Sequence, residues 1–231
     1  MNEREDPDPG VAGHSARREY ERRRERRQRN LAARSGFARL LAALLGPPAE
    51  EKRQLAHEKS WATGSEGEQL LAESLARRCP EVSLLHDRRM PNRRANIDHI
   101  AVAASGVYVI DTKRYRGTIK VRKPLIGSPK LKIAGRDRTK LLDGLAAQVA
   151  AVQAALSHVA PAVSVRGCLC FVAPRGFMAD SGLPVLRTLK VNGYPLYYPR
   201  RLAKRLNRRG SLTAEQARVI HAELATRFPP A

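Results

Sequence analysis

The middle of the chain alternates between strand-like apolar segments and amphipathic helical segments, which predicts an α/β domain. The segments "EVSLLHD", "DHIAVAA" and "VYVIDTK" are typical of strands, and a turn at Ser105-Gly106 is predicted to join the last two. We expect "GTIKV" to continue the same sheet and "KLKIAG" to add another strand. "VRGCLCFVAP" is continuously apolar, which indicates a buried central strand.

Apolar residues at helical spacing occur in the sequence before and after these strands. In "SEGEQLLAESLARRC", Ser65 followed by Glu68 three residues later predicts a capping box at the start of a helix. "DRTKLLDGLAAQVAAVQAALSHV" is the longest helical pattern in the sequence. Two further helices are predicted after "YPLYY", in "PRRLAKRLNRR" and "TAEQARVIHAELATRF".

The N-terminal quarter of the chain has a different pattern. Residues 1–15 are expected to be disordered, because they are acidic and rich in proline. Residues 16–34 mix Arg and Glu without an apolar stripe, which predicts either an exposed helix with charge pairs or a solvated arm that touches phosphates. Residues 37–46 are predicted to form a short amphipathic helix. We therefore divide the chain into a charged extension, 1–59, and an α/β domain with basic C-terminal helices, 60–231.

The net charge indicates a polyanionic partner. The chain carries 43 Lys and Arg against 22 Asp and Glu, a formal net charge of +21. Residues 1–59 supply 14 basic and 10 acidic side chains, so most of the excess belongs to the predicted domain. Such a field attracts nucleic acid first and an anionic membrane surface second.

Cysteine usage and hydropathy indicate the compartment. Cys79, Cys168 and Cys170 are too few and too irregular for a disulfide framework, and a lone C-x-C lacks the second half of a zinc site. The N-terminus does not have the layout of a signal peptide, and "FARLLAALLG" is too short to span a bilayer. We therefore expect a cytoplasmic protein without an integral membrane segment.

Charged residues at the ends of the predicted strands are the main candidates for chemistry. Asp98 begins one strand, Asp111 ends the next, and Lys113 follows two residues later. Pairing across the turn brings the two aspartates together, and strand periodicity puts Asp111 and Lys113 on one face. Glu68 on the preceding helix is a candidate to complete the cluster. Crowded carboxylates repel one another, and a hard cation such as Mg²⁺ or Mn²⁺ with oxygen ligands relieves the repulsion. The lysine could orient or deprotonate an attacking water.

The chain resembles a known protein family in the order of these motifs. In "GSEGEQLLAESL" and "LLHDRRMPNRRANIDHIAVAASGVYVIDTKRYRGTI" the chain resembles the nuclease-related domain (NERD), a branch of the PD-(D/E)XK nuclease-like superfamily. The similar region covers residues 61–175 approximately. The resemblance implies a restriction-endonuclease-like fold, a mixed β-sheet core flanked by helices.

The resemblance also implies Mg²⁺-dependent cleavage of a phosphodiester bond, with Lys113 serving the attacking water. The implied metal ligands are Asp98, Asp111, the Thr112 carbonyl and Glu68. Gln148 is added as a catalytic candidate, because many members of the superfamily carry a glutamine on the following helix. By contrast, strand alternation turns His99 away from Asp98, and we expect a packed or hydrogen-bonded histidine there.

Basic segments on both sides of the carboxylates are predicted to contact phosphates, with a tyrosine available to stack on a base or sugar. The residues are Arg93, Arg94, Arg114, Tyr115, Arg116, Lys120, Arg122 and Lys123. No arrangement for reading bases is evident, so we expect weak sequence preference or none.

Three functions remain open from the sequence. The first is a metal-dependent nuclease, acting on DNA ahead of RNA. The second is a nucleic-acid-binding module with a nuclease-like fold and little or no cleavage. The third is a peripheral membrane or assembly protein anchored through residues 16–46. The oligomeric state is also open.

Overall fold

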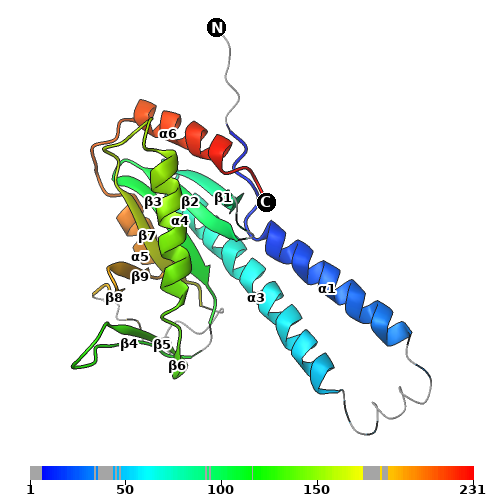
Figure 1. The fold of residues 1–231 in the computed structure, drawn as a ribbon. Coiled ribbons are helices and arrows are strands. Elements are labelled where there is room, and N and C mark those ends of the chain that lie inside the picture. The colour runs from blue at the N-terminus through cyan, green and yellow to red at the C-terminus, as the bar shows by residue number, and fades with distance from the viewer. Residues whose placement is uncertain are drawn as a thin grey trace.

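A helical arm projects from a body built around one mixed β-sheet (Figure 1). The computed structural model describes residues 7–33, 35, 44, 46, 48–91, 93, 95–115, 117–173, 183 and 187–231. The arm consists of α1 (His14–Ala32) and α3 (Ala49–Arg78), which lie side by side and leave the body together. Of the two alternatives left open for residues 16–34, the structure shows the helix with charge pairs. The helix expected over 37–46 lies almost entirely outside the described residues.

The central sheet has the strand order β1-β2-β3-β7-β9-β8. Strands β1 to β3 form an antiparallel meander, and β7 pairs in parallel with β3 and with β9. The predicted class, a mixed sheet flanked by helices, is confirmed. The strand bounds are β1 (Ser83–Arg89), β2 (Asn96–Ala103), β3 (Gly106–Lys113), β7 (Val165–Phe171), β8 (Lys190–Val191) and β9 (Tyr194–Tyr197).

The segment "GTIKV" does not continue this sheet, so that prediction was wrong. It forms β4 (Ile119–Arg122) of a separate three-stranded sheet with β5 (Lys130–Ile133) and β6 (Arg136–Asp137). The reason is that β7 occupies the free edge of β3 and leaves no place for β4 there. Because Asp137 belongs to β6 and residues 138–140 form a loop and turn, α4 covers only Leu141–Ala155 of the predicted long helix.

Two apolar layers cover the two faces of the sheet. One includes Leu169 and Phe171 of β7 and packs under α4 and α6 (Ala214–Arg227). The other includes Cys168 and Cys170 and packs under α3 and α5 (Pro199–Leu206). β7 is thus buried on both faces, as its continuous apolar run predicted. The three cysteines are free and buried. Among the described residues, no helix is both long and apolar enough to cross a membrane.

The predicted start of the first domain helix was wrong. α3 begins at Ala49 and runs through Ser65 without a break, so Ser65 does not cap a helix. Its hydroxyl instead donates to the carbonyl of Gly13 at 2.9 Å. The tertiary contact explains why a capping signal lies inside a helix. The predicted boundary at residues 59 and 60 also falls within α3.

The disorder expected for residues 1–15 is wrong for the part that the structure describes. Pro9 accepts a backbone hydrogen bond from His86 of β1 at 2.7 Å, and Asp8 accepts one from the Arg88 guanidinium at 3.0 Å. Arg88 is 1% exposed and also donates to carbonyls at the end of α6. Buried guanidinium groups need such partners, so Arg88 ties both ends of the chain to β1.

Candidate active site

Three aspartates lie in a row across β1, β2 and β3. The β2–β3 turn occupies positions 104–105, one residue earlier than predicted, and His99 pairs with Ile110. One step beyond this pair the register aligns Asp98 with Asp111. The β1–β2 register aligns Asp87 with Asp98 in the same way. The hairpin therefore brings the two predicted aspartates together and adds a third that the sequence analysis missed.

Hydrogen bonds fix Asp98 and Asp111 in different ways. The Asp98 carboxylate accepts the backbone N–H of Thr112 at 2.7 Å, which joins the beginning of β2 to the end of β3. Asp111 is 7% exposed and forms an ion pair with Lys113, on the same face of β3 as predicted. The Lys113 ammonium also donates to the Thr112 carbonyl at 3.2 Å. One ammonium thus contacts two of the oxygen groups predicted to bind metal.

Glu68 reaches this cluster from α3. Gly67 permits the approach, because a Cβ at that position would lie 3.1 Å from the Cβ of Arg114, just beyond the end of β3. Burial raises the pKa of Glu68 above its ordinary value, and the charges of Asp98 and Asp87 raise it further. Lys113 and the Gly13 backbone act in the opposite direction. The carboxyl is therefore predisposed to hold a proton at neutral pH.

The other charges respond to the same crowding. Burial and the Asp111 carboxylate raise the pKa of Asp98, although Lys113 and the Thr112 N–H oppose this shift. Burial alone would lower the pKa of Lys113, but Asp111 and Asp98 more than offset it and raise the pKa above the ordinary value. Lys113 is therefore a protonated donor in this arrangement, not a base.

Asp87 anchors the N-terminal segment at the site. Its carboxylate accepts the Ser15 backbone N–H at 2.5 Å, the Ser15 hydroxyl at 2.7 Å and the Asn96 amide at 2.9 Å. Its φ of 46° lies in the left-handed region, where aspartate is one of the more tolerant residues. The sequence held one signal for Asp87, a carboxylate at the end of a predicted strand like that of Asp111.

Gln148 reaches the backbone two residues before Asp98, and among the described residues it has no hydrogen bond to the carboxylates of the cluster. It is 8% exposed, and its amide nitrogen donates to the Asn96 carbonyl at 2.9 Å. Its amide oxygen is buried and has no hydrogen-bond partner among the described residues. His99 is fully buried, with its Nδ1 2.7 Å from Nδ1 of His86, which confirms the expected packed and hydrogen-bonded histidine.

The oxygen ligands at this site suit a hard cation by their chemistry, but they are not arranged as a metal site in this structure. The carboxylates and the Thr112 carbonyl are the oxygen ligands that Mg²⁺ and Mn²⁺ prefer. Within the described ranges, however, no three or more His, Cys, Asp or Glu side chains are arranged to hold a metal ion. Since the Lys113 ammonium contacts both Asp111 and the Thr112 carbonyl, it takes the position of a cation at two of the ligands. Metal binding would require Lys113 to withdraw from them.

Most of the predicted basic residues lie beyond the end of β3. Arg114 pairs with Glu66 of α3, and Tyr115 lies beneath the Arg138 guanidinium at 5.6 Å, so neither side chain is free. Arg93, Lys120, Arg122 and Lys123 are exposed. Arg94 and Arg116 lie outside the described residues.

The small sheet concentrates positive charge on one face. Lys120 pairs across the strands with Lys132, and Arg122 with Lys130, whereas the alternate positions Ile119, Val121, Leu131 and Ile133 pack on the core. Like charges directly opposite each other destabilise a strand pair. The ion pair of Lys132 with Asp137, at 3.3 Å, offsets part of this repulsion. No ion-pair partner among the described residues is found for Lys120, Arg122 and Lys130. A bound polyanion would relieve the remaining repulsion.

One family comparison bears on this site. Residues 63–172 match the family model of the nuclease-related domain. Over this range the chain is similar to the nuclease-related domain. The resemblance inferred from the motifs is confirmed, and the PD-(D/E)XK superfamily is consistent with the family. No curated protein and no solved structure gave a significant match.

The nuclease-related domain contains all of the predicted site residues but not all of the residues that shape the site. Glu68, Asp98, Asp111, Lys113 and Gln148 fall inside it. The Gly13 and Ser15 backbones, which contact Glu68 and Asp87, lie outside the matched range in the N-terminal segment. α1, α5 and α6 also lie outside it.

Proposed function

We propose that this protein is a metal-dependent nuclease that hydrolyses phosphodiester bonds in nucleic acid, DNA ahead of RNA. The proposal rests on one observation: the β2–β3 register aligns Asp98 with Asp111 and places the Lys113 ammonium on Asp111. A nuclease-related domain supports the reaction class. The free, buried cysteines suit a reducing compartment, so we place the reaction in the cytoplasm.

The residues have distinct roles in this proposal. Mg²⁺ or Mn²⁺ would be held by Asp98, Asp111, the Thr112 carbonyl and Glu68. When bound, the ion lowers the pKa of a water molecule and neutralises charge on the phosphate. In the reaction the water gives up one proton to the surrounding solvent as its oxygen bonds to phosphorus. The bond to the leaving oxygen breaks, and the leaving oxygen takes up a proton from the solvent. Lys113, as a protonated donor, orients the water and stabilises the charge that grows on the phosphate. Gln148 positions the Asn96 backbone just before Asp98.

The basic face of the small sheet supports nucleic acid as the substrate. β4 follows β3 along the chain, so Lys120 and Arg122 lie only a few residues after Lys113. We propose that Arg93, Lys120, Arg122 and Lys123 contact phosphates on either side of the bond that is cut. Since phosphate contacts carry no sequence information, we expect little sequence preference.

The second candidate is a nucleic-acid-binding module that cuts poorly. The contact of Lys113 with two predicted ligands favours it, because this ammonium already neutralises Asp111 without a metal ion. Under this alternative, divalent cations change neither the stability of the protein nor its affinity for DNA.

One experiment separates the two candidates. Purified protein is incubated with supercoiled double-stranded DNA and circular single-stranded DNA, with Mg²⁺, Mn²⁺ or chelator. Asp111→Asn is the test variant, and Asp143→Asn, at an exposed position in the first turn of α4, is the matched control. Nicking that requires metal, is lost in Asp111→Asn and persists in Asp143→Asn supports the nuclease. If circles, linear DNA and RNA all stay intact while binding is retained, the binding module is the better description.

A further inference from the structure

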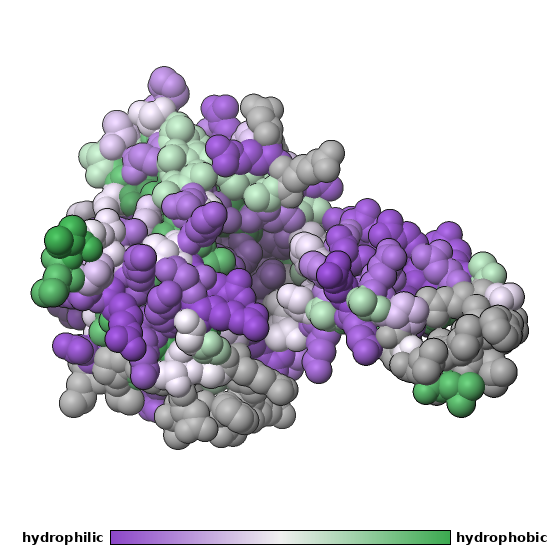
Figure 2. Space-filling view, turned by 60° about the horizontal axis from the view of Figure 1, so that its bottom comes forward, coloured by the Kyte–Doolittle hydropathy of each residue, from purple (hydrophilic) through white to green (hydrophobic). Residues whose placement is uncertain are grey.

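The outward surface of α1 has no role in the site described above. α1 packs along α3, and Ala16 is its one buried residue. The helix carries eight arginines and three glutamates. Figure 2 shows that the surface of the arm is predominantly hydrophilic where it is described. A helix that is polar all round buries little apolar area, so apolar packing does not account for its position along α3.

The inward side of α1 accounts for only some of these arginines. Arg27 donates to the carboxylate of Glu58 on α3 at 2.9 Å, and this glutamate is 5% exposed. Arg23 lies over the Trp61 ring, 6.0 Å from its centroid. These contacts hold α1 against α3 through charge and an aromatic face instead of an apolar seam.

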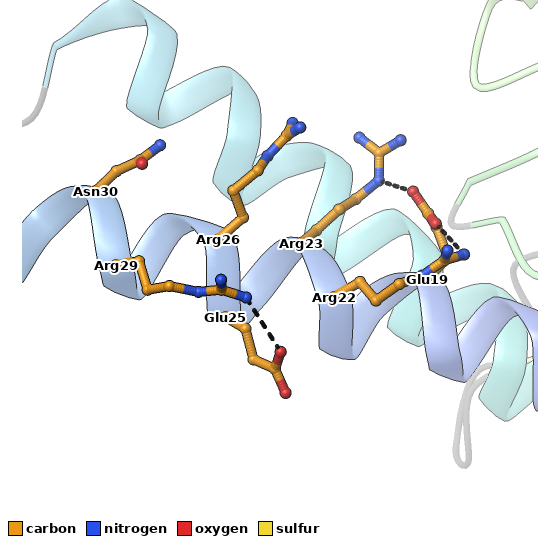
Figure 3. Close-up of a pocket in the computed structure, with 7 residues that line it drawn as sticks. All are labelled: Glu19, Arg22, Arg23, Glu25, Arg26, Arg29 and Asn30. Carbon is orange, nitrogen blue, oxygen red and sulfur yellow. Dashed lines mark hydrogen bonds and ion pairs between the residues drawn. The ribbon is translucent and has the colours of Figure 1, made fainter.

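A second set of arginines runs along one exposed flank of α1. Arg18, Arg22, Arg26 and Arg29, called here the arginine row, follow one another at intervals of three or four residues. Figure 3 shows Arg22, Arg26 and Arg29 around one pocket, with Arg22 paired to Glu19 at 2.7 Å and Arg29 to Glu25 at 3.7 Å. Arg18 and Arg26 are exposed and have no ion-pair partner among the described residues. Like charges four residues apart destabilise a helix, and a bound anion would offset that repulsion.

The arginine row leads from the arm to the body. Arg18 and Arg22 line a second pocket together with Arg89, the last residue of β1, and with Glu21 and Glu25. The exposed Arg93 follows in the β1–β2 loop, three residues before β2 begins at Asn96. The row from Arg18 to Arg29 extends about 16 Å, at 1.5 Å per helical residue. Positive charge therefore continues from the arm toward the candidate active site.

The chemistry of the row points to one class of partner. An anionic membrane or a partner helix would need an apolar stripe on α1, and the described helix has none. Single-stranded nucleic acid is bound by stacking on exposed aromatic rings. On the arm, Tyr20 of α1 is half-buried, and the Trp61 ring of α3 is already covered on one face by the Arg23 guanidinium. A row of guanidinium groups suits the regular phosphates of a duplex, and arginines one turn apart, about 6 Å, pass roughly every second phosphate of a strand.

We propose that the arginine row binds the phosphate backbone of duplex nucleic acid beside the segment that enters the active site. This deepens the proposed function by naming the duplex and the surface that holds its flank. The arm contributes affinity and the salt dependence of binding, and it leaves the chemical step unchanged. Binding is measured with chelator present, so the inference is tested whether or not the protein cuts.

The test compares two triple variants of the full chain. Arg18→Gln/Arg22→Gln/Arg26→Gln neutralises the row. Lys204→Gln/Arg208→Gln/Arg209→Gln removes the same charge from exposed positions in and after α5, which packs at the opposite end of α3. Dissociation constants for a fluorescent duplex are measured by anisotropy at salt concentrations from about 50 mM to about 200 mM. Circular dichroism checks that both variants fold. Vesicles of phosphatidylcholine with phosphatidylserine serve as a competing anionic surface.

We expect neutralisation of the row to reduce the slope of log affinity against log salt by about 2 to 3 units and to weaken binding tenfold or more, because three phosphate contacts are lost. The α5 control should change both quantities much less. Where cleavage is present, the row variant should raise KM and keep kcat. An unchanged slope, an equal loss in both variants, or a loss confined to vesicle binding would overturn the proposal.

Discussion

The carboxylate of Asp98 accepts the backbone N–H of Thr112 at 2.7 Å, and this bond joins the beginning of β2 to the end of β3. Because Thr112 lies between Asp111 and Lys113, the bond also fixes the D-x-K segment relative to Asp98. Glu68 then approaches from α3, so that three carboxylates and one ammonium share a partly buried space. The crowding has consequences for stability that can be measured separately from catalysis.

Glu68→Gln should make the protein more stable above the ordinary pKa range of a carboxyl group. Burial raises the folded-state pKa of Glu68, so its contribution to stability is fully present below the unfolded-state pKa and is lost as pH rises. A glutamine keeps the neutral form at every pH. We expect a gain on the order of 1–3 kcal/mol at pH 8 and almost none near pH 4, measured by urea denaturation.

The matched control is Glu73→Gln on the same helix. Glu73 is exposed, and its pair with Arg77 at 3.9 Å is weak. Its replacement should change stability by less than about 0.5 kcal/mol at either pH. A Glu68→Gln protein that is less stable than the wild type at pH 8 would show that the ionised carboxylate is favourable in the folded state.

Two glycines inside α3 provide a test of how closely the helix must approach the site. Both sit in the helix, but a Cβ at Gly64 meets nothing within 4 Å, whereas one at Gly67 lies 3.1 Å from Arg114. Gly64→Ala should stabilise the protein by about 0.5–1 kcal/mol, the difference in helix propensity. Gly67→Ala should gain less and should reduce cleavage, because it moves Glu68 away from Asp98. Thermal melts and initial cleavage rates decide this, and equal activity in both variants contradicts it.

Local patterns predicted the strands and the charged cluster well. The alternation in "DHIAVAA" and "VYVIDTK" identifies two strands, and their short connection leaves antiparallel pairing as the natural outcome. Asp98, Asp111 and Lys113 are therefore near one another in any register close to the predicted one. The turn lies one residue earlier than expected, and this shift sets Asp98 opposite Asp111.

The errors concern contacts between segments that are distant in sequence. Nothing in "GTIKV" shows that β7, more than forty residues later, takes the edge of β3. Ser65 has the composition of a cap, but packing against Gly13 and continuous helix on both sides override it. Ser15 reaches Asp87 across 72 residues. Such contacts depend on the assembled fold, so the role of the N-terminal segment was not visible in the sequence.

Removal of His86 should change how stability responds to acid. Burial lowers the pKa of His86 to about 4, and the pKa of His99 lies well below its ordinary value. A lowered folded-state pKa means that the stability from each histidine is present above about 6.5, the unfolded value, and is lost as pH falls. Glu68 and Asp98 act in the opposite direction over the same range, so the wild type should show little net change between pH 5 and 6.5.

We expect His86→Gln to gain stability relative to the wild type as pH falls, by about 1 kcal/mol per pH unit below 6.5. His158→Gln is the control, because His158 is exposed and lies outside the histidine pair. Denaturant titrations at pH 5, 6 and 7 measure the difference. If the free energy of unfolding depends on pH in the same way for His86→Gln and the wild type, His86 is not held neutral by the fold.

The contact of Lys113 with Asp111 and the Thr112 carbonyl predicts competition between this ammonium and a divalent cation. Lys113→Met removes the competing charge, so the variant should bind Mn²⁺ several-fold more tightly than the wild type in calorimetric titrations. Its cleavage rate should nevertheless fall by about 10²-fold or more, since a charged donor to the developing phosphate charge is lost. Lys204→Met, at an exposed position of α5, should change neither quantity. Weaker Mn²⁺ binding by Lys113→Met would mean that the lysine supports the metal site instead of competing with it.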